Sequence, residues 1–224
     1  MKKFGFTLIE ILIALTVVGV LAAILVPQIA NLIPDENKLR VLRTQKMLTE
    51  INRELLNDKG IYYETYDDND NKPTCQGFAC LRKPLKEPYN DNKYSDNKKF
   101  VNILADKLDY DAFQDSSLEG EEGDYFYTKD GAYWKISKSD ITINDGVDNI
   151  EIGLLVDFGG TVAGVNCLYD QDSCPNPDRF EFTIDTYGKI TGSDSLTKAY
   201  LENPDKTNDR RVDFARAKEI SESK

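Results

Sequence analysis

Residues 2–28, KKFGFTLIEILIALTVVGVLAAILVPQ, are the most informative stretch of this sequence for its fold class. From Phe6 to Val26 this segment is almost wholly apolar. About 21 residues at ~1.5 Å per residue give a helix of roughly 30 Å, the thickness of the hydrocarbon core of a bilayer. Lys2 and Lys3 precede it, and basic residues favour the cytoplasmic side of a span. The segment is therefore predicted to cross the membrane once, with all later residues outside the cytoplasm.

A single carboxylate, Glu10, lies near the start of this apolar run. A charged group within a span costs a few kcal/mol on insertion scales, so it persists mainly where it has a partner or a task. One interpretation is that Glu10 reaches the headgroup region and has no role. The other is that it meets a positive charge inside the bilayer. A free α-amino group, created by cutting the chain just before the apolar run, would supply that charge.

The residues around Glu10 resemble a known processing signature. Gly5-Phe6-Thr7-Leu8-Ile9-Glu10, after a short lysine-bearing leader, is similar to the cleavage and methylation signature of type IV pilins and type II secretion pseudopilins. The resemblance implies that prepilin peptidase, a membrane enzyme, cuts after Gly5 and methylates the new terminal amine of Phe6. It also implies that Glu10 neutralises the terminal amine of a neighbouring subunit as filaments assemble.

Two residues that weaken helices belong to the same resemblance. Pro27 stands where helices of the family often bend or melt, and Gly19 lies upstream of it. Proline removes one helical hydrogen bond and clashes with the preceding turn, and glycine has a low helix propensity. Together they predict an extensible segment within the assembly helix.

Two other interpretations of the N-terminus compete with this one. A secretory signal peptide has an apolar region of about 7–15 residues and ends at an A-x-A-like site. This run is longer and offers only a loose match at Val20-Leu21-Ala22. A plain single-pass anchor for a periplasmic binding or enzymatic domain explains the length of the run, but it gives no role to Glu10 or to the Gly5-Phe6 junction.

Composition limits the functions open to the rest of the chain. The 224 residues leave room for one medium-sized domain after the N-terminal segment. The net charge of −11 argues against nucleic acid as a partner. The chain has no histidine, which removes Ser-His-Asp and Cys-His catalysis and histidine-ligated zinc. No local group of residues supports other catalysis, so an enzyme is not expected.

Four cysteines occur as two closely spaced pairs, Cys75 with Cys80 and Cys167 with Cys174. Outside the cytoplasm an even number of cysteines favours disulfides, although four cysteines allow three connectivities. We expect the two local pairs. A zinc site made of all four thiolates fits poorly, because the spacings differ from the short C-x2-C spacing of such sites.

The pattern after the membrane segment predicts a second helix. Asp35 can cap it, apolar residues then recur at three- and four-residue steps from Leu39 to Leu55, and Lys59-Gly60 ends it. Residues 61–99 are rich in Asn, Asp, Lys and Pro, which is typical of surface turns. A short helix is expected from Phe100 to about Leu108.

From Tyr125 onward the hydrophobic period changes to two, which indicates strands. Asp130-Gly131 lies between two aromatic-rich runs and predicts a hairpin with a type I′ turn. Residues 149–158 predict a buried strand, and residues 179–190 predict another strand followed by a turn. The polar segment 191–224 is expected to form two short, exposed helices separated by Pro204.

Residues 156–190 bear a second resemblance, to a C-terminal pattern of some pilin-like secretion proteins. There an acidic turn leads through a Pro-Asn loop to a final hairpin, and some pseudopilins bind calcium in this loop. Here Phe158-Gly159 replaces the usual turn residues, and a cysteine loop is inserted at 167–174. An acidic turn that only bonds its own backbone is the other interpretation. Carboxylates are ligands that calcium prefers, and the candidates are Asp157, Asp170, Asp172 and Asp178. No other cofactor is expected.

The resemblance implies a pilin-like α+β fold. A long N-terminal α-helix, membrane-spanning in its first half and amphipathic in its second, packs on a small antiparallel β-sheet head. The expected parts are a leader (1–5), a transmembrane and assembly helix (6–33), an amphipathic helix (34–60), and an extracytoplasmic head with a polar C-terminal tail (61–224). The implied function is that of a structural subunit of a type IV pilus or type II secretion pseudopilus. Its expected partners are prepilin peptidase, the inner-membrane assembly machinery and other subunits, first in the bacterial inner membrane and then in a filament.

Overall fold

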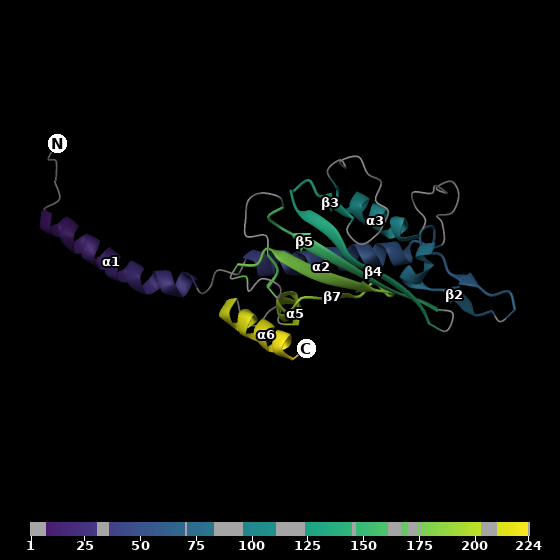
Figure 1. Ribbon diagram of the computed structural model, residues 1–224. Coiled ribbons are helices and arrows are strands. Elements are labelled where there is room, and N and C mark those ends of the chain that lie inside the picture. The colour runs from purple at the N-terminus through teal and green to yellow at the C-terminus, as the bar shows by residue number, and fades with distance from the viewer. Residues whose placement is uncertain are drawn as a thin grey trace, which may run out of the picture.

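The structure is a computed structural model in which a rod-like helix precedes a mixed α/β head (Figure 1). It describes residues 8–30, 36–69, 71–82, 96–110, 124–144, 147–160, 167–169, 174, 176–202 and 210–223. Helix α1 (Leu8–Ala30) extends away from the head, and helix α2 (Glu36–Asn57) lies along one face of the head's sheet (Figure 1). The predicted α+β fold, with N-terminal helices and an antiparallel sheet, is confirmed.

The described strands of the head form a five-stranded antiparallel sheet in which each strand pairs with the next one along the chain. The strands, in order, are β3 (Tyr125–Tyr127), β4 (Tyr133–Asn144), β5 (Val147–Asp157), β6 (Arg179–Asp185) and β7 (Ile190–Gly192). Trp134 pairs with Val156, and Val156 pairs with Phe180. Residues paired directly across neighbouring strands point to the same face of a sheet, so these three residues share one face, and all three are buried.

Helix α2 supplies the other half of the core. Its buried side chains recur at three- and four-residue steps, as an amphipathic helix requires, and they include Val41, Leu48, Ile51 and Leu55. Together with the inward-facing residues of the strands they form one hydrophobic cluster. The Asn52 amide also donates a 3.2 Å hydrogen bond to the carbonyl of Gly188, in the turn between β6 and β7. Apolar burial thus fixes α2 to the sheet, and this bond adds a polar contact at one end.

The hairpin at Asp130-Gly131 is present, but its turn type differs from the prediction. A type I′ turn needs positive φ at both central residues, whereas only Gly131 has one, at 87°. The N–H of Gly131 donates to the Thr128 carbonyl at 2.8 Å, and the N–H of Thr128 donates to the Ala132 carbonyl at 3.0 Å. This is the geometry of a type I turn followed by a glycine bulge. Asp130 accepts bonds from its neighbours instead of adopting a left-handed conformation.

Part of the segment 61–99 is core, and the expectation of surface turns is wrong for that part. Strands β1 (Thr65–Tyr66) and β2 (Pro73–Cys75) form a small ladder, and the 3-10 helix η1 (Gly77–Arg82) follows. Phe78, Cys80 and Leu81 in η1 are fully buried. The sequence pattern did not predict burial of the run GFACLR, because the run is short and polar residues flank it on both sides. Helix α3 (Asp96–Lys107) begins four residues earlier than expected.

The C-terminal segment does form two helices, α5 (Ser195–Glu202) and α6 (Arg210–Glu222), but α5 is not exposed. Leu196, Ala199 and Tyr200 are buried in the core. Asp194 caps α5, because its carboxylate accepts a 2.9 Å bond from the N–H of Thr197. The expectation of exposure was wrong because polar residues such as Ser195 and Thr197 are buried beside this cap.

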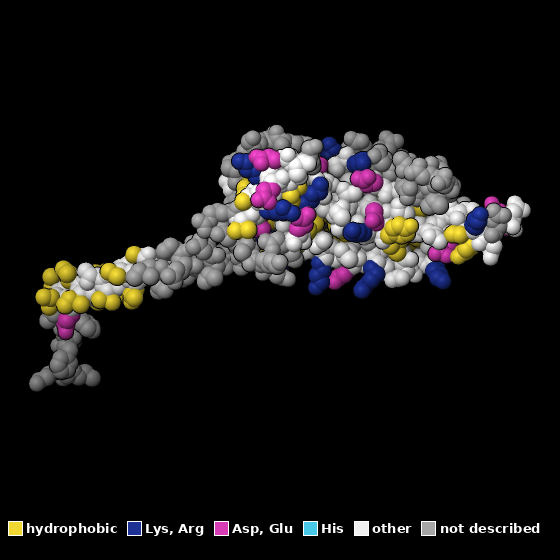
Figure 2. Space-filling view, turned by 90° about the horizontal axis from the view of Figure 1, so that it is seen from below, with side chains coloured by type: hydrophobic (Ala, Val, Ile, Leu, Met, Phe, Trp, Pro, Cys, Tyr) yellow, Lys and Arg dark blue, Asp and Glu magenta, His cyan; other side chains and the backbone are white. Residues whose placement is uncertain are grey.

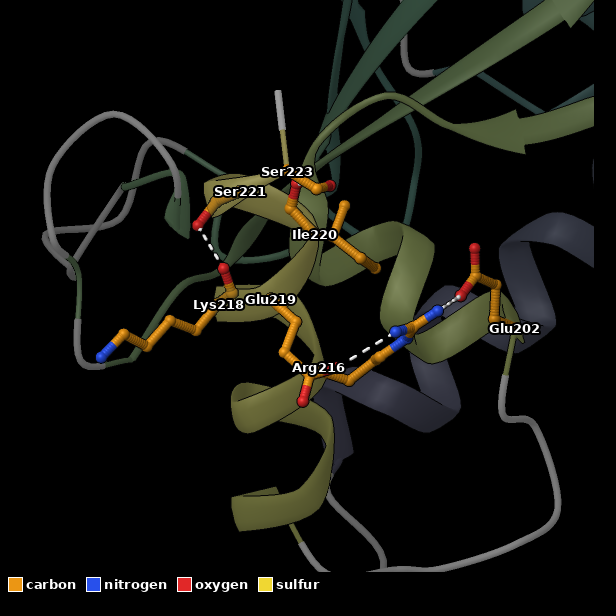
Figure 3. A network of polar contacts seen from close by, with 7 residues as sticks. All are labelled: Glu202, Arg216, Lys218, Glu219, Ile220, Ser221 and Ser223. Carbon is orange, nitrogen blue, oxygen red and sulfur yellow. Dashed lines mark hydrogen bonds and ion pairs between the residues drawn. The ribbon is translucent and has the colours of Figure 1, made fainter.

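Helix α6 contacts the rest of the head through apolar and polar side chains: Ala217 is buried in the core, and Phe214 and Ile220 pack against it. Figure 3 shows Arg216 reaching from α6 to Glu202 of α5, at 3.3 Å, with Glu219 on its other side at 3.1 Å. Both of these ion pairs are exposed. A further contact is buried: Lys38 of α2 donates to the two carboxylate oxygens of Asp213 at 3.0 and 2.9 Å, and both side chains are at most 3% exposed. The last helix is thereby tied to the first turn of α2.

We predict that replacing Asp213 with Ala lowers the free energy of unfolding by about 3–5 kcal/mol, because it leaves the Lys38 ammonium buried without this carboxylate. The measurement is chemical denaturation of the full-length chain in detergent. The matched control is Glu202→Ala, which removes an exposed ion pair and should cost less than about 1 kcal/mol. The double change Lys38→Met and Asp213→Leu should recover most of the loss. If Asp213→Ala lowers the free energy of unfolding by no more than the control does, the Lys38–Asp213 ion pair is not buried as described.

A second buried cation, Lys99 of α3, lies in the core. Its side chain is fully buried, its Nζ donates to the Cys80 carbonyl at 3.3 Å, and it lies 4.4 Å from the centre of the Tyr62 ring. Removal from water disfavours the ammonium form, which lowers the pKa of Lys99 from 10.5 to about 8. Burial raises the pKa of Tyr62 for the same reason, because its charged form is the phenolate.

This pKa shift predicts how stability changes with pH. Between about pH 8 and 10.5 the unfolded chain holds a proton on Lys99 that the folded chain has released, so the free energy of unfolding rises with pH. From pH 7 to 9.5 the contribution of Lys99 should grow by about 2 kcal/mol. The measurement is the difference in unfolding free energy between the wild type and Lys99→Met at each pH. A difference that stays constant over this range would contradict the buried cation.

Candidate functional site

Helix α1 is the feature for which the head provides no packing partner. Its described side chains, residues 8–23, are exposed on every side of the helix. Figure 2 shows hydrophobic side chains covering this part of the molecule. Leu8 is 82% exposed and Leu15 is 67% exposed. Burial of one such side chain contributes about 1.5–3 kcal/mol, so a whole apolar helix calls for covering by lipid or by other chains.

Glu10 lies in the first turn of α1 and is the acidic residue of this helix. It borders a shallow groove whose other residues are Ile11, Ala14, Leu15 and Val18. These positions follow steps of one, three and four residues, so they share one face of the helix. The side-chain carboxylate of Glu10 is therefore the one charged group in a groove that is otherwise apolar. A second helix lying in the groove would bring its own groups against this carboxylate.

Among the residues that the structure describes, no helix meets the length and apolarity expected of a membrane span.

The two residues expected to weaken the helix do not interrupt it. Helix α1 continues through Gly19 and through Pro27 to Ala30. A side chain at Gly19 would meet no atom within 4 Å, so this glycine is not required by packing within the chain. Helix α2 begins at Glu36, and residues 31–35 between the two helices lie outside the described residues. Whether Gly19 and Pro27 make the segment extensible stays a prediction.

The predicted processing site also lies outside the described residues. Gly5 and Phe6 precede Leu8, the first residue that the structure describes. Their roles as cleavage and methylation positions therefore rest on the sequence. Glu10 follows Phe6 by four residues, a little over one helical turn.

The calcium candidates are in part accounted for by local bonds. Asp157 accepts a 2.9 Å bond from Nε of Arg179 and another of 2.9 Å from the N–H of Gly159. Asp178 accepts a 2.9 Å bond from the N–H of Cys167. Asp170 and Asp172 lie outside the described residues. Within the described parts of the chain, no three or more metal-binding side chains come together, and calcium stays a prediction.

The cysteines form two local disulfides, Cys75–Cys80 and Cys167–Cys174, the pairs expected from their spacing. The first joins β2 to η1 and lies in the core. The second lies in the segment before β6, next to Tyr169. The Tyr169 ring meets the Phe214 ring of α6 edge to face at 5.2 Å. Sequence reasoning missed this contact, since the two rings are 45 residues apart and neither belongs to a motif.

Residues 1–26 match the family model described as the prokaryotic N-terminal methylation motif, the prepilin-type signature of type IV pilins and pseudopilins. The signature predicted at Gly5–Glu10 is thereby confirmed. The match covers the N-terminal segment and does not extend into the head. Comparison with curated proteins and with solved structures found no match.

Proposed function

We propose that the chain is a structural, non-catalytic subunit of a type IV filament, either a pilus or a type II secretion pseudopilus. One observation carries the proposal: the prepilin-type methylation motif at residues 1–26 includes most of an apolar helix whose described side chains, residues 8–23, are exposed all around its circumference. A helix that is hydrophobic on all sides belongs in a membrane or in the interior of a larger assembly. A filament subunit needs both environments in succession.

The proposed sequence of events begins in the bacterial inner membrane, with α1 inserted and the head outside the cytoplasm. Prepilin peptidase removes residues 1–5 and methylates Phe6. Removal of the leader takes away Lys2 and Lys3, which changes the side-chain charge from −11 to −13 and creates a cationic terminus beside α1. The chain then leaves the bilayer and packs its apolar helix against those of other subunits, guided by the inner-membrane assembly machinery.

In this proposal, Glu10 sets the axial register between neighbouring α1 helices. In a low-dielectric bundle a carboxylate without a positive partner is strongly disfavoured, because burial removes its hydration. Pairing with the terminal amine of a neighbouring copy removes that penalty at one axial position. The ion pair adds little net stability, since both charges lose water. Its value lies in selecting the alignment of two helices that are otherwise uniformly apolar.

A single-pass anchor for a periplasmic binding or enzymatic domain is the second candidate. It accounts for an apolar helix joined to a folded head. It leaves the methylation motif and the carboxylate on the apolar groove without a role. The filament proposal uses both.

We predict that Glu10→Ala and Glu10→Gln each reduce incorporation of the chain into filaments by at least about tenfold, because either change removes the charge that selects the register. Incorporation is measured as the fraction of chain in sheared or pelleted filaments, with total chain quantified in the same cells. Processing and head folding should persist, since the groove that Glu10 borders is lined by residues of α1 and lies away from the core of the head.

Thr16→Ala is the matched control. Thr16 lies on the same exposed helix and its hydroxyl bonds only the carbonyl of Ile13, at 2.8 Å. It should leave incorporation within about twofold of the wild type. Normal incorporation of both Glu10 variants would contradict the charge-pair mechanism and favour the anchor.

A further inference from the structure

The outward face of α2 carries a stripe of three cations, Arg43, Lys46 and Arg53, which we call the basic stripe. At 3.6 residues per turn these positions fall within an arc of about 80° around the helix. All three side chains are exposed, on the side of α2 opposite its buried residues. Figure 2 shows Lys and Arg side chains projecting in a row from the lower edge of the molecule, the side on which α2 lies.

Within the described residues, the three cations of the basic stripe are in no ion pair. Other cations near it are paired: Arg40 contacts Glu36 at 2.5 Å, and Lys107 of α3 contacts Glu54. Among the residues that the structure describes, none forms a salt bridge with the three stripe cations. Exposed, unpaired cations at helical spacing form a charged surface that an external partner can contact without first breaking a bond.

The charge of the stripe is opposite to that of the remaining chain. Helix α2 has five basic and three acidic residues, a net charge of +2. The whole chain carries −11, so the residues outside α2 carry −13. Lys38 is buried against Asp213, so the outward face of α2 carries only a small local excess of cations in a molecule that is strongly acidic overall. A second copy of the same chain offers the complementary charge.

The surface beside the basic stripe also has exposed apolar side chains and a shallow hollow. Leu39 and Met47, both on this exposed side of α2, are each 36% exposed. A shallow hollow runs past the C-terminal half of the helix, bordered by Met47, Glu50, Arg53 and Lys107. Apolar patches and hollows rimmed by charges are typical of protein–protein contacts.

We propose that the basic stripe of α2 docks against the acidic head surface of a second copy of this chain. The inference rests on the proposed function in one respect, which is that α1 bundling brings copies side by side. Since α2 follows α1 along the chain, contact between α1 helices places the outward faces of α2 next to neighbouring heads. The basic stripe then selects which face of the neighbour is contacted, because two acidic faces would repel each other.

A polyanion such as nucleic acid fits the surface less well. Glu50 lies within the same arc as Lys46 and Arg53 and would repel a phosphate backbone. The exposed Leu39 and Met47 also have no counterpart in a chain of phosphates. A protein surface that is mainly acidic, with scattered cations and apolar side chains, matches the mixture better.

The test uses Lys46 as the reporter in the full-length chain. A 1:1 mixture of ¹⁵N-labelled and unlabelled chain, in filaments and separately in detergent micelles, is treated with a zero-length carbodiimide crosslinker. Mass spectrometry then identifies links between copies. We expect Lys46 to be joined to Asp or Glu residues of the other isotope. In the double variant Arg43→Gln with Arg53→Gln, the yield of these links should fall at least about tenfold. Loss of two of the three stripe cations weakens the electrostatic attraction that holds Lys46 against the neighbouring copy.

The matched control removes the same charge elsewhere, with Lys129→Gln and Lys218→Gln, two lysines that are 62% and 70% exposed in ion pairs away from α2. This control should leave the Lys46 links unchanged. Links that occur only within one copy, or that survive in Arg43→Gln with Arg53→Gln, would overturn the proposal. So would retention of labelled duplex DNA by the wild type, lost in that variant, without links between copies.

The outcomes for the docking surface and for the proposed function can be separated. Filaments that contain the chain but yield no Lys46 links between copies overturn the docking surface and leave the filament function intact. A wild-type chain that never enters filaments contradicts the proposed function. In that case Lys46 links in micelles support the docking surface by themselves.

Discussion

An apolar helix that its own chain does not cover is the constraint on which the whole molecule depends. The head needs no help from α1, because α2, the sheet and the C-terminal helices bury a core of their own. Helix α1 has the reverse property, with large apolar side chains exposed on all sides. Its stability must come from lipid or from other chains. In the filament we propose, the carboxylate of Glu10 gives this otherwise non-specific apolar contact a preferred alignment.

The head holds α2 by apolar packing on one side and by one buried ion pair. Apolar residues on one side of α2 lock it to the sheet, and the Lys38–Asp213 pair ties its first turn to the last helix. Buried pairs of this type contribute orientation more than stability. The outward side of α2 is left charged and open. Helix α2 thus has one face buried in the head and one face exposed, and the exposed face is the one we propose for contact with a neighbouring copy.

Local rules allowed much of this fold to be predicted. The apolar run, the three- and four-residue steps from Leu48 to Leu55 and the alternation around Phe180 each specify one element, whereas Leu39, expected on the same stripe, lies on the exposed side of α2. The errors arise where tertiary packing overrides composition. Polar Ser195 and Thr197 are buried because Asp194 caps their helix, and residues 78–81 are core despite the polar residues on both sides of GFACLR. The Lys38–Asp213 pair joins positions 175 residues apart, which no local pattern can reveal. At the candidate site the sequence identified Glu10, but the exposure of the helix around it needed the structure.

Mass spectrometry of the mature N-terminus tests the central claim most directly. The chain is recovered from membranes of cells that contain an active prepilin peptidase, and its terminal peptide is sequenced. The account predicts a terminus at Phe6 that carries one added methyl group. An intact Met1 terminus in the presence of the active peptidase would contradict it, because Glu10 would then have no terminal amine with which to pair.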